Sequence, residues 1–467
     1  MSQPIPPPAE ETAALSVWDA VSLIVGIVIG STVFKMSGTI FANVPDPWTG
    51  LGIWILCGGL SFAGALCYAE LATTYSRLGG EYNYLSRAFG RPVGFLFGWS
   101  QLAIIQTGSI GALSYVFAEY AVKVFGVGED AVVWFALAAV VGLTGLNCLG
   151  IQSGKWTQNL LSAAKALGLV LLIVAGLSAT GTASLAVTQP VGKGGWPLAM
   201  ILVLYAYGGW NDAAFVAADV RDRRRNIPRA LLMGIGVITA CYVLLNAAYL
   251  ATLGFEGLRA SRQPASDAMK AVFGRIGERA ISVLVMVSAL GSVNGLVFSV
   301  SRLHATVGAD HRAFALLGHW SKWSKAPVWS LLVQGAVASS MIFCVGTDSG
   351  RKMMDSCLAA IGAKPVPWAR YYYDGFETLF AASAPIFWLF FLTTGVSYFV
   401  LWWKDRDIER PFRAPLFPLC PLLFSAMCLF GLYSATVYAA PLLPLIAVPF
   451  LLGVPLYVVS ELSRPRP

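Results

Sequence analysis

Apolar segments of similar length recur along almost the whole of this 467-residue chain. Each is close to the roughly 20 residues that an α-helix needs to cross a bilayer. Backbone in hydrocarbon must satisfy its own hydrogen bonds, which leaves helices or closed barrels, and these runs are too long and continuous for barrel strands. Charged residues make up only 12% of the chain, against about 25% in soluble domains. The sequence therefore predicts an all-α membrane protein.

We expect about twelve transmembrane helices, one in each apolar run. They are predicted near residues 16–44, 51–75, 93–124, 131–150, 157–178, 195–218, 229–254, 280–308, 327–346, 377–403, 415–437 and 440–460. Only short polar breaks divide the fourth span from the fifth and the eleventh from the twelfth, where "AAPLLP" predicts a tight turn. Together the spans form a single transmembrane domain over 16–462, after a Pro-rich tail at 1–15 that we expect to be disordered.

Positive charge predicts the orientation of these spans. Basic residues gather in three short connections: Arg77, Arg87 and Arg91 after the second span, Arg221, Arg223, Arg224, Arg225 and Arg229 after the sixth, and Lys404, Arg406, Arg410 and Arg413 after the tenth. All three connections are cytoplasmic if both termini are cytoplasmic, as the positive-inside rule requires. We therefore attribute the net charge of +8 to this excess of basic residues on the cytoplasmic side, where they also contact anionic lipid. We do not interpret it as a sign of nucleic-acid binding. The multi-pass chain is expected in a plasma or bacterial inner membrane.

Two longer connections fall on the opposite side. One, near 255–279, has mixed charge, and the other, at 347–376, is unusually long. We expect the second to be an extended external loop, either a small external cap or a tolerated insertion.

The chain offers no set of residues typical of an enzyme or a metal site. Its eight cysteines and three histidines show no metal-ligand spacing, and no HExxH, Walker-type or GxSxG motif occurs in the context it needs. We expect no enzymatic activity, no cofactor and no metal. A bridge between Cys344 and Cys357, which flank the outer part of the ninth span, is left open.

The first and sixth spans share an unusual feature, since each is interrupted by small residues near its middle. The first reads "GIVIGSTVF" (26–34) and the sixth reads "YAYGGWND" (205–212), although each glycine costs a helix interior about 1 kcal/mol relative to alanine. Matching breaks in two sets of five spans are typical of inverted repeats. We predict one repeat at 16–178, a second at 195–403, and two further helices at 415–460.

Paired breaks of this kind have a chemical use. A broken helix leaves free N–H groups at the start of one half, which suit a carboxylate, and free C=O groups at the end of the other, which suit an ammonium group. Two facing breaks would therefore make a site for an α-amino acid, built mostly from backbone. Close helix packing explains either glycine motif alone equally well, but it explains the matched pair less well.

At these motifs the chain resembles the amino acid–polyamine–organocation (APC) superfamily, and within it the L-type amino acid transporter-like group. The resemblance rests on "GIVIGSTVF" (26–34), "GALCYAELATTYSRLGGEYNYL" (64–85), "LSAAKALGL" (161–169), "YAYGGWN" (205–211), "NIPRAL" (226–231), "GSVNGLVFSVSRL" (291–303) and, among the last spans, "ERPFRAPLFP" (409–418). It implies secondary transport of an amino acid across the membrane by alternating access.

The resemblance also implies roles for individual residues. The substrate carboxylate would be bound by backbone amides of Gly30, Ser31 and Thr32, and the amino group by carbonyls of Val28, Tyr205 and Gly208, with Asn211 shaping the amine end. Tyr205 would also act as a gate over the substrate. Thr32 departs from the glycine usual in the family, and its Cβ reduces the space for a bulky substrate.

Lys165 is a charge within an otherwise apolar fifth span, which marks function by default. The resemblance places it where sodium-coupled relatives hold a cation, against Gly26, Ser292 and Asn294, so Na⁺ is not expected. Snorkelling of the long side chain to the cytoplasmic surface is the alternative. The sequence leaves open whether Lys165 stays charged in an exchanger or cycles a proton.

Other polar residues have several interpretations. Gln106, Thr107 and Ser109 either line the pocket or, as mid-span polar residues more often do, join neighbouring helices. Asp212 would recognise a cationic side chain or a proton, or pair with a nearby polar group. Glu70, Glu81 and Arg302 are expected in gate or loop salt bridges near the cytoplasmic side.

We therefore expect sodium-independent exchange of small to medium neutral L-amino acids. The alternatives are a proton-coupled amino acid symporter, a carrier of cationic amino acids or polyamines, and a sensor that binds without transporting. Animal members of the resembled group pair with a single-span glycoprotein through a cysteine between the third and fourth spans. The corresponding stretch here, "VKVFGVGEDAV" (122–132), has no cysteine, so no disulfide-linked heavy subunit is expected.

Overall fold

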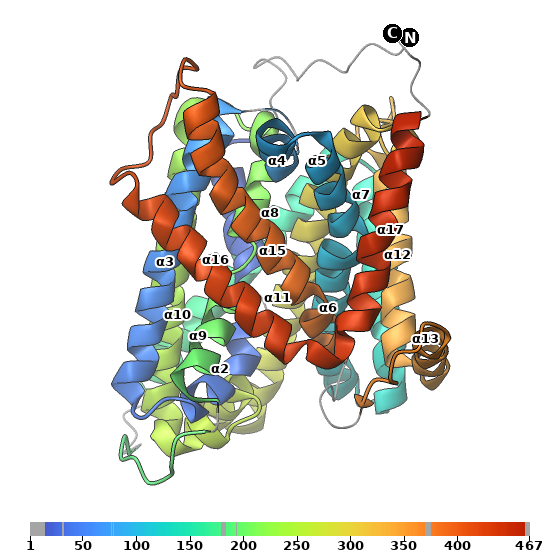
Figure 1. Cartoon of the computed structure of the whole chain (residues 1–467). Coiled ribbons are helices and arrows are strands. Elements are labelled where there is room, and N and C mark those ends of the chain that lie inside the picture. Colours follow the sequence, from blue (N-terminus) through green and yellow to red (C-terminus); the bar gives the residue numbers. More distant parts are fainter. Residues whose placement is uncertain are drawn as a thin grey trace.

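The computed structural model describes residues 15–29, 32–75, 77, 79–178, 184–192, 194–368 and 375–462. Within these ranges the regular structure is helical, and the one strand-like feature is an isolated bridge between Leu15 and Val220. The helices form a single bundle (Figure 1). The all-α prediction is confirmed.

The described helices follow the apolar runs of the sequence. They are α1 (Val17–Val28), α2 (Thr32–Ala42), α3 (Pro47–Thr74), α4 (Glu81–Phe89), α5 (Arg91–Ser100), the π-helical turn η2 (Gln101–Ile105), α6 (Gln106–Phe125), η3 (Glu129–Ala131), α7 (Val132–Cys148), α8 (Ile151–Ser178), α9 (Gly195–Ala206), the 3₁₀ segment η4 (Trp210–Asp219), α10 (Arg223–Ala260), α11 (Pro264–Asp310), η5 (Arg312–Phe314), α12 (Val328–Gly346), α13 (Asp348–Ala360), α15 (Gly375–Lys404), α16 (Leu419–Tyr438), η6 (Ala440–Leu442) and α17 (Leu443–Leu462).

The number of spans agrees with the prediction. In the described part of the chain ten helices are long and apolar enough to cross a membrane, and the bent pair α1–α2 makes an eleventh. The short α9, continued by η4, occupies the remaining predicted run at 195–218. The predicted division between the fourth and fifth spans is confirmed, because two residues separate α7 from α8. The division between the eleventh and twelfth spans is confirmed as well, because η6 separates α16 from α17.

Two expected connections are structured. The stretch 255–279, predicted as a loop, is largely helical, because α10 and α11 continue through it with sharp breaks at Gly254 (φ 69°) and Gly274 (φ 61°). Glycine tolerates these left-handed conformations, so each helix changes direction without ending. Phe255 and Leu258 are buried there, and packing of these side chains stabilises the extra turns.

The long connection at 347–376 contains α13. Thr347 caps this helix by accepting a hydrogen bond from the N–H of Gly350 (3.0 Å). Asp355 accepts hydrogen bonds from the Trp368 indole (3.0 Å) and the Val366 N–H (3.1 Å), which folds the following segment back onto the helix. In Figure 1, α13 lies at the end of the bundle opposite to the C-terminal end of α17. Cys344 and Cys357 are free thiols, so the structure forms no bridge between them.

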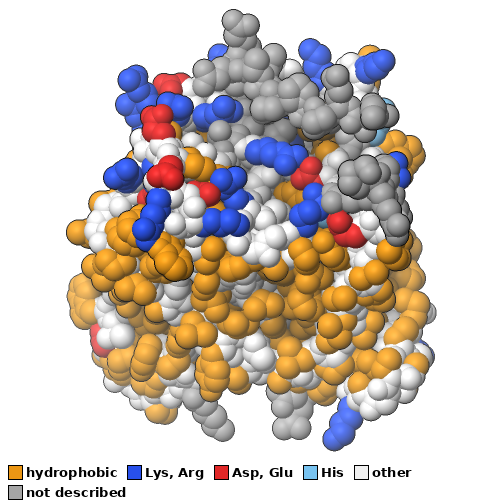
Figure 2. All heavy atoms as spheres, turned by 45° about the horizontal axis from the view of Figure 1, so that its top comes forward, with side chains coloured by type: hydrophobic (Ala, Val, Ile, Leu, Met, Phe, Trp, Pro, Cys, Tyr) orange, Lys and Arg blue, Asp and Glu red, His pale blue; other side chains and the backbone are white. Residues whose placement is uncertain are grey.

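Charge and hydrophobicity divide the surface. Figure 2 shows Lys and Arg side chains gathered at one end of the molecule and hydrophobic side chains in a broad belt below them. Exposed hydrophobic side chains of the chain include Trp134, Leu160 and Leu171. Apolar surface of this extent is expected where lipid covers the protein.

Candidate functional site

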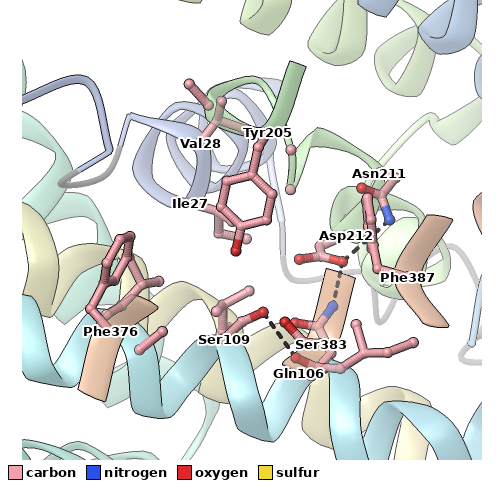
Figure 3. A pocket seen from close by; sticks show the side chains of 17 residues that line it. Ile27, Val28, Gln106, Ser109, Tyr205, Asn211, Asp212, Phe376, Ser383 and Phe387 are labelled. Atoms are coloured by element: carbon pink, nitrogen blue, oxygen red, sulfur yellow. Dashed lines mark hydrogen bonds between the residues drawn. The ribbon is translucent and has the colours of Figure 1, made fainter. Parts of the chain in front are cut away.

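A pocket lies where the broken helices meet. It is lined by Ile27 and Val28 of α1, Ile105 of η2, Gln106, Ser109, Ala112 and Leu113 of α6, residues Tyr205, Ala206, Gly208, Gly209, Asn211 and Asp212 around the α9–η4 break, Leu296 of α11, and Phe376, Ser383 and Phe387 of α15 (Figure 3). The empty space in it, including the part that opens outward, is about 750 Å³. A mostly apolar lining with a few polar groups that converge on it is typical of small-molecule sites.

The first span breaks as predicted. Its two halves, Val17–Val28 and Val33–Ala42, are inclined by 52° to each other. Gly30 and Ser31 lie outside the described residues, and Thr32 is the first residue of α2. The role of these three residues in binding a carboxylate therefore stays a prediction.

The sixth span breaks directly against the first. After α9 ends, the N–H of Gly208 donates to the Tyr205 carbonyl (2.8 Å) and Gly209 adopts a left-handed conformation (φ 104°). A Cβ at Gly209 would lie 2.7 Å from Cγ2 of Ile27. Glycine is needed here both for its backbone angle and for its close approach to α1.

Tyr242 of α10 joins the two breaks, and sequence reasoning missed it. Its hydroxyl lies 2.7 Å from the Val28 carbonyl and 2.9 Å from the Ala206 carbonyl, and a hydroxyl donates only one hydrogen at a time. The second carbonyl keeps a free lone pair, which suits an ammonium group. A tyrosine inside a buried span gives no sequence signal that separates this role from ordinary packing.

Tyr205 points into the pocket (Figure 3). Its ring meets Phe380 of α15 edge to face, and Phe380 in turn stacks on Phe376. An aromatic group at this place closes one side of the pocket by contact with α15. This position is compatible with a gate, a role that stays a prediction.

The polar residues of α6 divide into two groups. Gln106 and Ser109 line the pocket, whereas the Thr107 hydroxyl donates to the Leu102 carbonyl (2.9 Å) inside the helix. All three residues lie in the first turn of α6, directly after the π-helical turn η2. Such turns occur frequently at functional sites.

Asp212 lies in the pocket wall among amides. Its Oδ1 accepts a hydrogen bond from Gln106 Nε2 (2.9 Å) and lies 3.5 Å from Asn211 Nδ2. In Figure 3 the other carboxylate oxygen is turned toward the side on which Tyr205 lies. Within the described ranges, no basic side chain forms an ion pair with Asp212.

The three charged residues expected in salt bridges have different surroundings. Glu70 is paired with Arg410 and also accepts hydrogen bonds from the Tyr398 hydroxyl (2.5 Å) and the Ala414 N–H (2.7 Å). Arg302 lies with its guanidinium 3.7 Å from the centre of the Phe298 ring. Glu81 has no ion pair among the described residues. It is the buried first residue of α4, and it accepts a hydrogen bond from the Tyr68 hydroxyl.

Lys165 is fully buried within the bundle. Its Nζ donates to the Gly26 carbonyl (2.7 Å) and to the Ser292 hydroxyl (3.2 Å), and Ser292 Oγ also lies 3.0 Å from that carbonyl. The amine thus joins α8 to the broken helix α1 and to α11, away from any membrane surface.

Asn294 lies in a neighbouring set of contacts. Its side chain contacts Asn147 (2.8 Å) and Gln158 (3.0 Å), and the structure shows no hydrogen bond between it and Lys165. In the described residues no group of three or more His, Cys, Asp or Glu side chains is arranged to hold a metal ion.

Comparison with known proteins agrees with this architecture. Residues 15–455 match the family model for amino acid permeases. The b(0,+)-type amino acid transporter 1 of Mus musculus is 30% identical over 420 residues, covering 87% of this chain and 79% of the mouse protein. The human cystine/glutamate transporter is 29% identical, over 99% of this chain and 88% of the human protein. The serine/threonine exchanger SteT of Bacillus subtilis is 28% identical, with 90% of each chain covered.

The match extends over both broken spans, the lysine of α8 and the pocket, and its relatives are amino acid transporters and not enzymes. This chain belongs to the amino acid permease family of the APC superfamily, within its L-type amino acid transporter-like group.

Proposed function

We propose that this protein exchanges small to medium neutral L-amino acids across the membrane by alternating access, without sodium. The observation that carries the proposal is the amine of Lys165, which donates to the Gly26 carbonyl of α1 and to Ser292 of α11. A donor amine already lies where a cation would join these two helices. Na⁺ would have to displace this amine from the Gly26 carbonyl.

The walls of the pocket support a small neutral substrate. Most of its side chains are apolar or aromatic, among them Ile27, Val28, Leu113 and Phe387. Carbonyls of the broken helices would bind the amino group, and N–H groups at the start of α2 would bind the carboxylate. The relative SteT is a serine/threonine exchanger, which fits a substrate of this size.

Proteoliposome counterflow tests the proposal. Vesicles containing purified protein and unlabelled alanine or serine should take up labelled neutral amino acid, and choline in place of Na⁺ should leave the rate unchanged. A panel of external competitors would define the class. Uptake that requires Na⁺, or competition only by lysine, arginine or putrescine, would contradict it, and saturable binding without uptake would indicate a sensor.

We also propose that the basic end of the molecule faces the cytoplasm, with both termini. The ion pair Arg87–Asp405 joins α4 to the residue after α15, and Figure 1 shows α4 at the same end of the bundle as the C-terminal end of α17. Excess basic residues in short connections are typical of cytoplasmic surfaces. Labelling of a cysteine placed at exposed Arg224 or, at the other end, at exposed Lys352 with an impermeant maleimide in intact cells would decide the orientation.

A further inference from the structure

Two carboxyl groups are buried near the pocket with no cation beside them. Asp212 in η4 and Glu81 at the start of α4 are each 2% exposed. Neither forms an ion pair with a described residue, in contrast to Glu70, which is equally buried and is paired with Arg410. The chain therefore neutralises one buried carboxylate with an arginine and leaves two without such a partner.

Neutral polar groups connect the two acids. Asn211 lies between them, with its Nδ2 3.5 Å from Oδ1 of Asp212 and its side chain also interacting with Glu81. Gln106 donates to the far side of Asp212, and the Tyr68 hydroxyl donates to Oε1 of Glu81. These contacts form a continuous polar path from the pocket to the start of α4.

Among the residues that the structure describes, no positive group balances this path. The titratable groups that face Glu81 from the surrounding elements are Tyr68 of α3, Tyr84 of α4, Asp212 of η4 and the Cys428 thiol of α16. All four are neutral or acidic, and in the described part of the chain Glu81 is the one ionisable group that acts on Asp212.

Two like charges in such surroundings cannot both persist. Burial disfavours each carboxylate, and the charge of one disfavours that of the other. An uncompensated buried ion is strongly disfavoured even after the surrounding structure relaxes. In addition, Oε2 of Glu81 and Oδ1 of Asn211 have no hydrogen-bond partner, and a proton on Glu81 would supply a donor to a region that has too many acceptors.

The surroundings of Glu81 depend on the position of η4. The N–H of Gly79 donates to the Phe215 carbonyl (3.4 Å), and Gly80 (φ 47°) packs so closely on Ala214 that a Cβ would lie 2.8 Å from its backbone. The other end of η4 is tied to the start of α1, where the Arg221 N–H donates to the Leu15 carbonyl (2.9 Å). Movement of η4 relative to α4 would therefore open the buried site.

We propose that Glu81 and Asp212 form a proton-binding pair, and that the carrier loaded with a neutral amino acid changes its access only when this pair holds a proton. The inference rests on the proposed function and adds a second, protonic ligand to the same site. In the binding step one carboxylate takes up one proton and becomes a carboxylic acid. Opening of the contact between α4 and η4 returns the carboxyl group to water and releases the proton.

The pH dependence follows from this arrangement. Burial raises the pKa of Glu81 to about 7, with hydrogen bonds from Tyr68 and Asn211 partly opposing the effect. The acid form therefore predominates below pH 7 and is lost as the pH rises through that value. Between pH 6 and pH 8 the protonated fraction of such a group falls from about nine tenths to about one tenth. The rate of exchange should fall about tenfold over the same interval.

The experiment is alanine counterflow in proteoliposomes with equal pH on both sides, from pH 5.5 to 8.5. We expect the wild-type rate to decline about tenfold between pH 6 and pH 8. Glu81→Gln, which imitates the protonated acid, should exchange alanine at a rate that is nearly independent of pH. Glu129→Gln, an exposed carboxylate in η3, is the matched control and should keep the wild-type profile.

Asp212→Asn provides a second readout that does not depend on the Glu81 variant. It leaves Glu81 as the one acid of the pair, so the residual activity should still fall as the pH rises through about 7. A flat wild-type profile, or a flat profile in Asp212→Asn, would overturn the inference while leaving exchange itself established. If Asp212→Asn abolishes only competition by lysine and arginine, the carboxylate binds a cationic side chain and not a proton. Absence of exchange at every pH would overturn the proposed function as well.

Discussion

At the scale of single residues, Lys165 connects three helices through one amine. Lys165→Ala should leave the Gly26 carbonyl with only the Ser292 hydroxyl beside it. A hydrogen bond that involves a charged group contributes about 1.5–3 kcal/mol, so we expect transport to fall about 10- to 100-fold. Counterflow at matched protein levels measures the loss, and size-exclusion profiles in detergent should stay close to wild type.

Lys322→Ala is the matched control for this variant, because Lys322 is exposed. It should transport at the wild-type rate. Normal transport by Lys165→Ala, or a sodium requirement in the wild type, would show that the buried amine does not replace a cation.

Thr32 and Tyr205 should affect different properties of the transporter. Backbone groups bind the α-amino and α-carboxyl ends of every substrate alike, and a pocket separates neighbouring side chains by only about 1–3 kcal/mol per methylene. Thr32→Gly should therefore extend the accepted class toward bulkier neutral amino acids. Tyr205→Ala should slow the exchange of all substrates, whereas Tyr205→Phe keeps the ring contact with Phe380 and should keep most activity.

Competition profiles and single-substrate rates separate these two roles. An unchanged profile in Thr32→Gly would show that this position does not limit substrate size. A defect of Tyr205→Ala confined to large substrates would place the ring beside the substrate side chain rather than over the whole substrate.

At the scale of elements, the break in the sixth span depends on Gly209. Its left-handed backbone costs any other residue about 1–2 kcal/mol, and the added Cβ of Gly209→Ala would meet Ile27 at 2.7 Å. We expect most transport to be lost because η4 is displaced from α1. Gly142→Ala in α7, where a Cβ meets nothing within 4 Å, is the control and should be active. Equal activity of the two variants would contradict a close contact between the breaks.

The sequence predicted those elements that have local signals. Runs of apolar residues located the spans, small residues within them located both breaks, and a charge in an apolar span located the amine that meets Gly26 and Ser292. Tyr242 and the inward-facing Glu81 were not predicted as parts of the site. Their roles arise from tertiary packing, since α10 brings a hydroxyl to two distant carbonyls and the Gly79–Gly80 turn directs α4 under η4.

The helical stretches at 255–279 show the same limit. Mixed charge and the glycines at 254 and 274 are typical of a loop, but burial of Phe255 and Leu258 keeps the backbone helical on both sides of each break. Local composition does not show which side chains become buried when the rest of the chain folds, and this tertiary packing overrides local propensity.

At the scale of the whole molecule, the buried ion pair between Arg410 and Glu70 links the connection between α15 and α16 to α3. Arg410 and Glu70 are both nearly inaccessible, and the Tyr398 hydroxyl and the Ala414 N–H share the carboxylate. Breaking such a pair by removing one partner costs about 3–5 kcal/mol, whereas replacing both partners is often nearly neutral. Arg410→Met should therefore lower the apparent Tm in detergent, and adding Glu70→Gln should recover part of the loss. A double variant less stable than Arg410→Met alone would contradict this account.

The complete transporter should also work as a single polypeptide. The connection between α6 and α7, where animal members of the resembled group carry the linking cysteine, reads Gly126–Ala131 and contains none. Cys357 in α13 is exposed, whereas the other seven cysteines are buried or half-buried. Cys357 is therefore the thiol best placed for a bond to another protein. We expect purified wild type and Cys357→Ser to exchange amino acids equally well in proteoliposomes. The expected result follows because the helix bundle of this one chain already contains both broken spans, the amine of Lys165 and the pocket between the breaks. Transport that appears only after a second polypeptide is added, or that is lost in Cys357→Ser, would show that the chain depends on a partner.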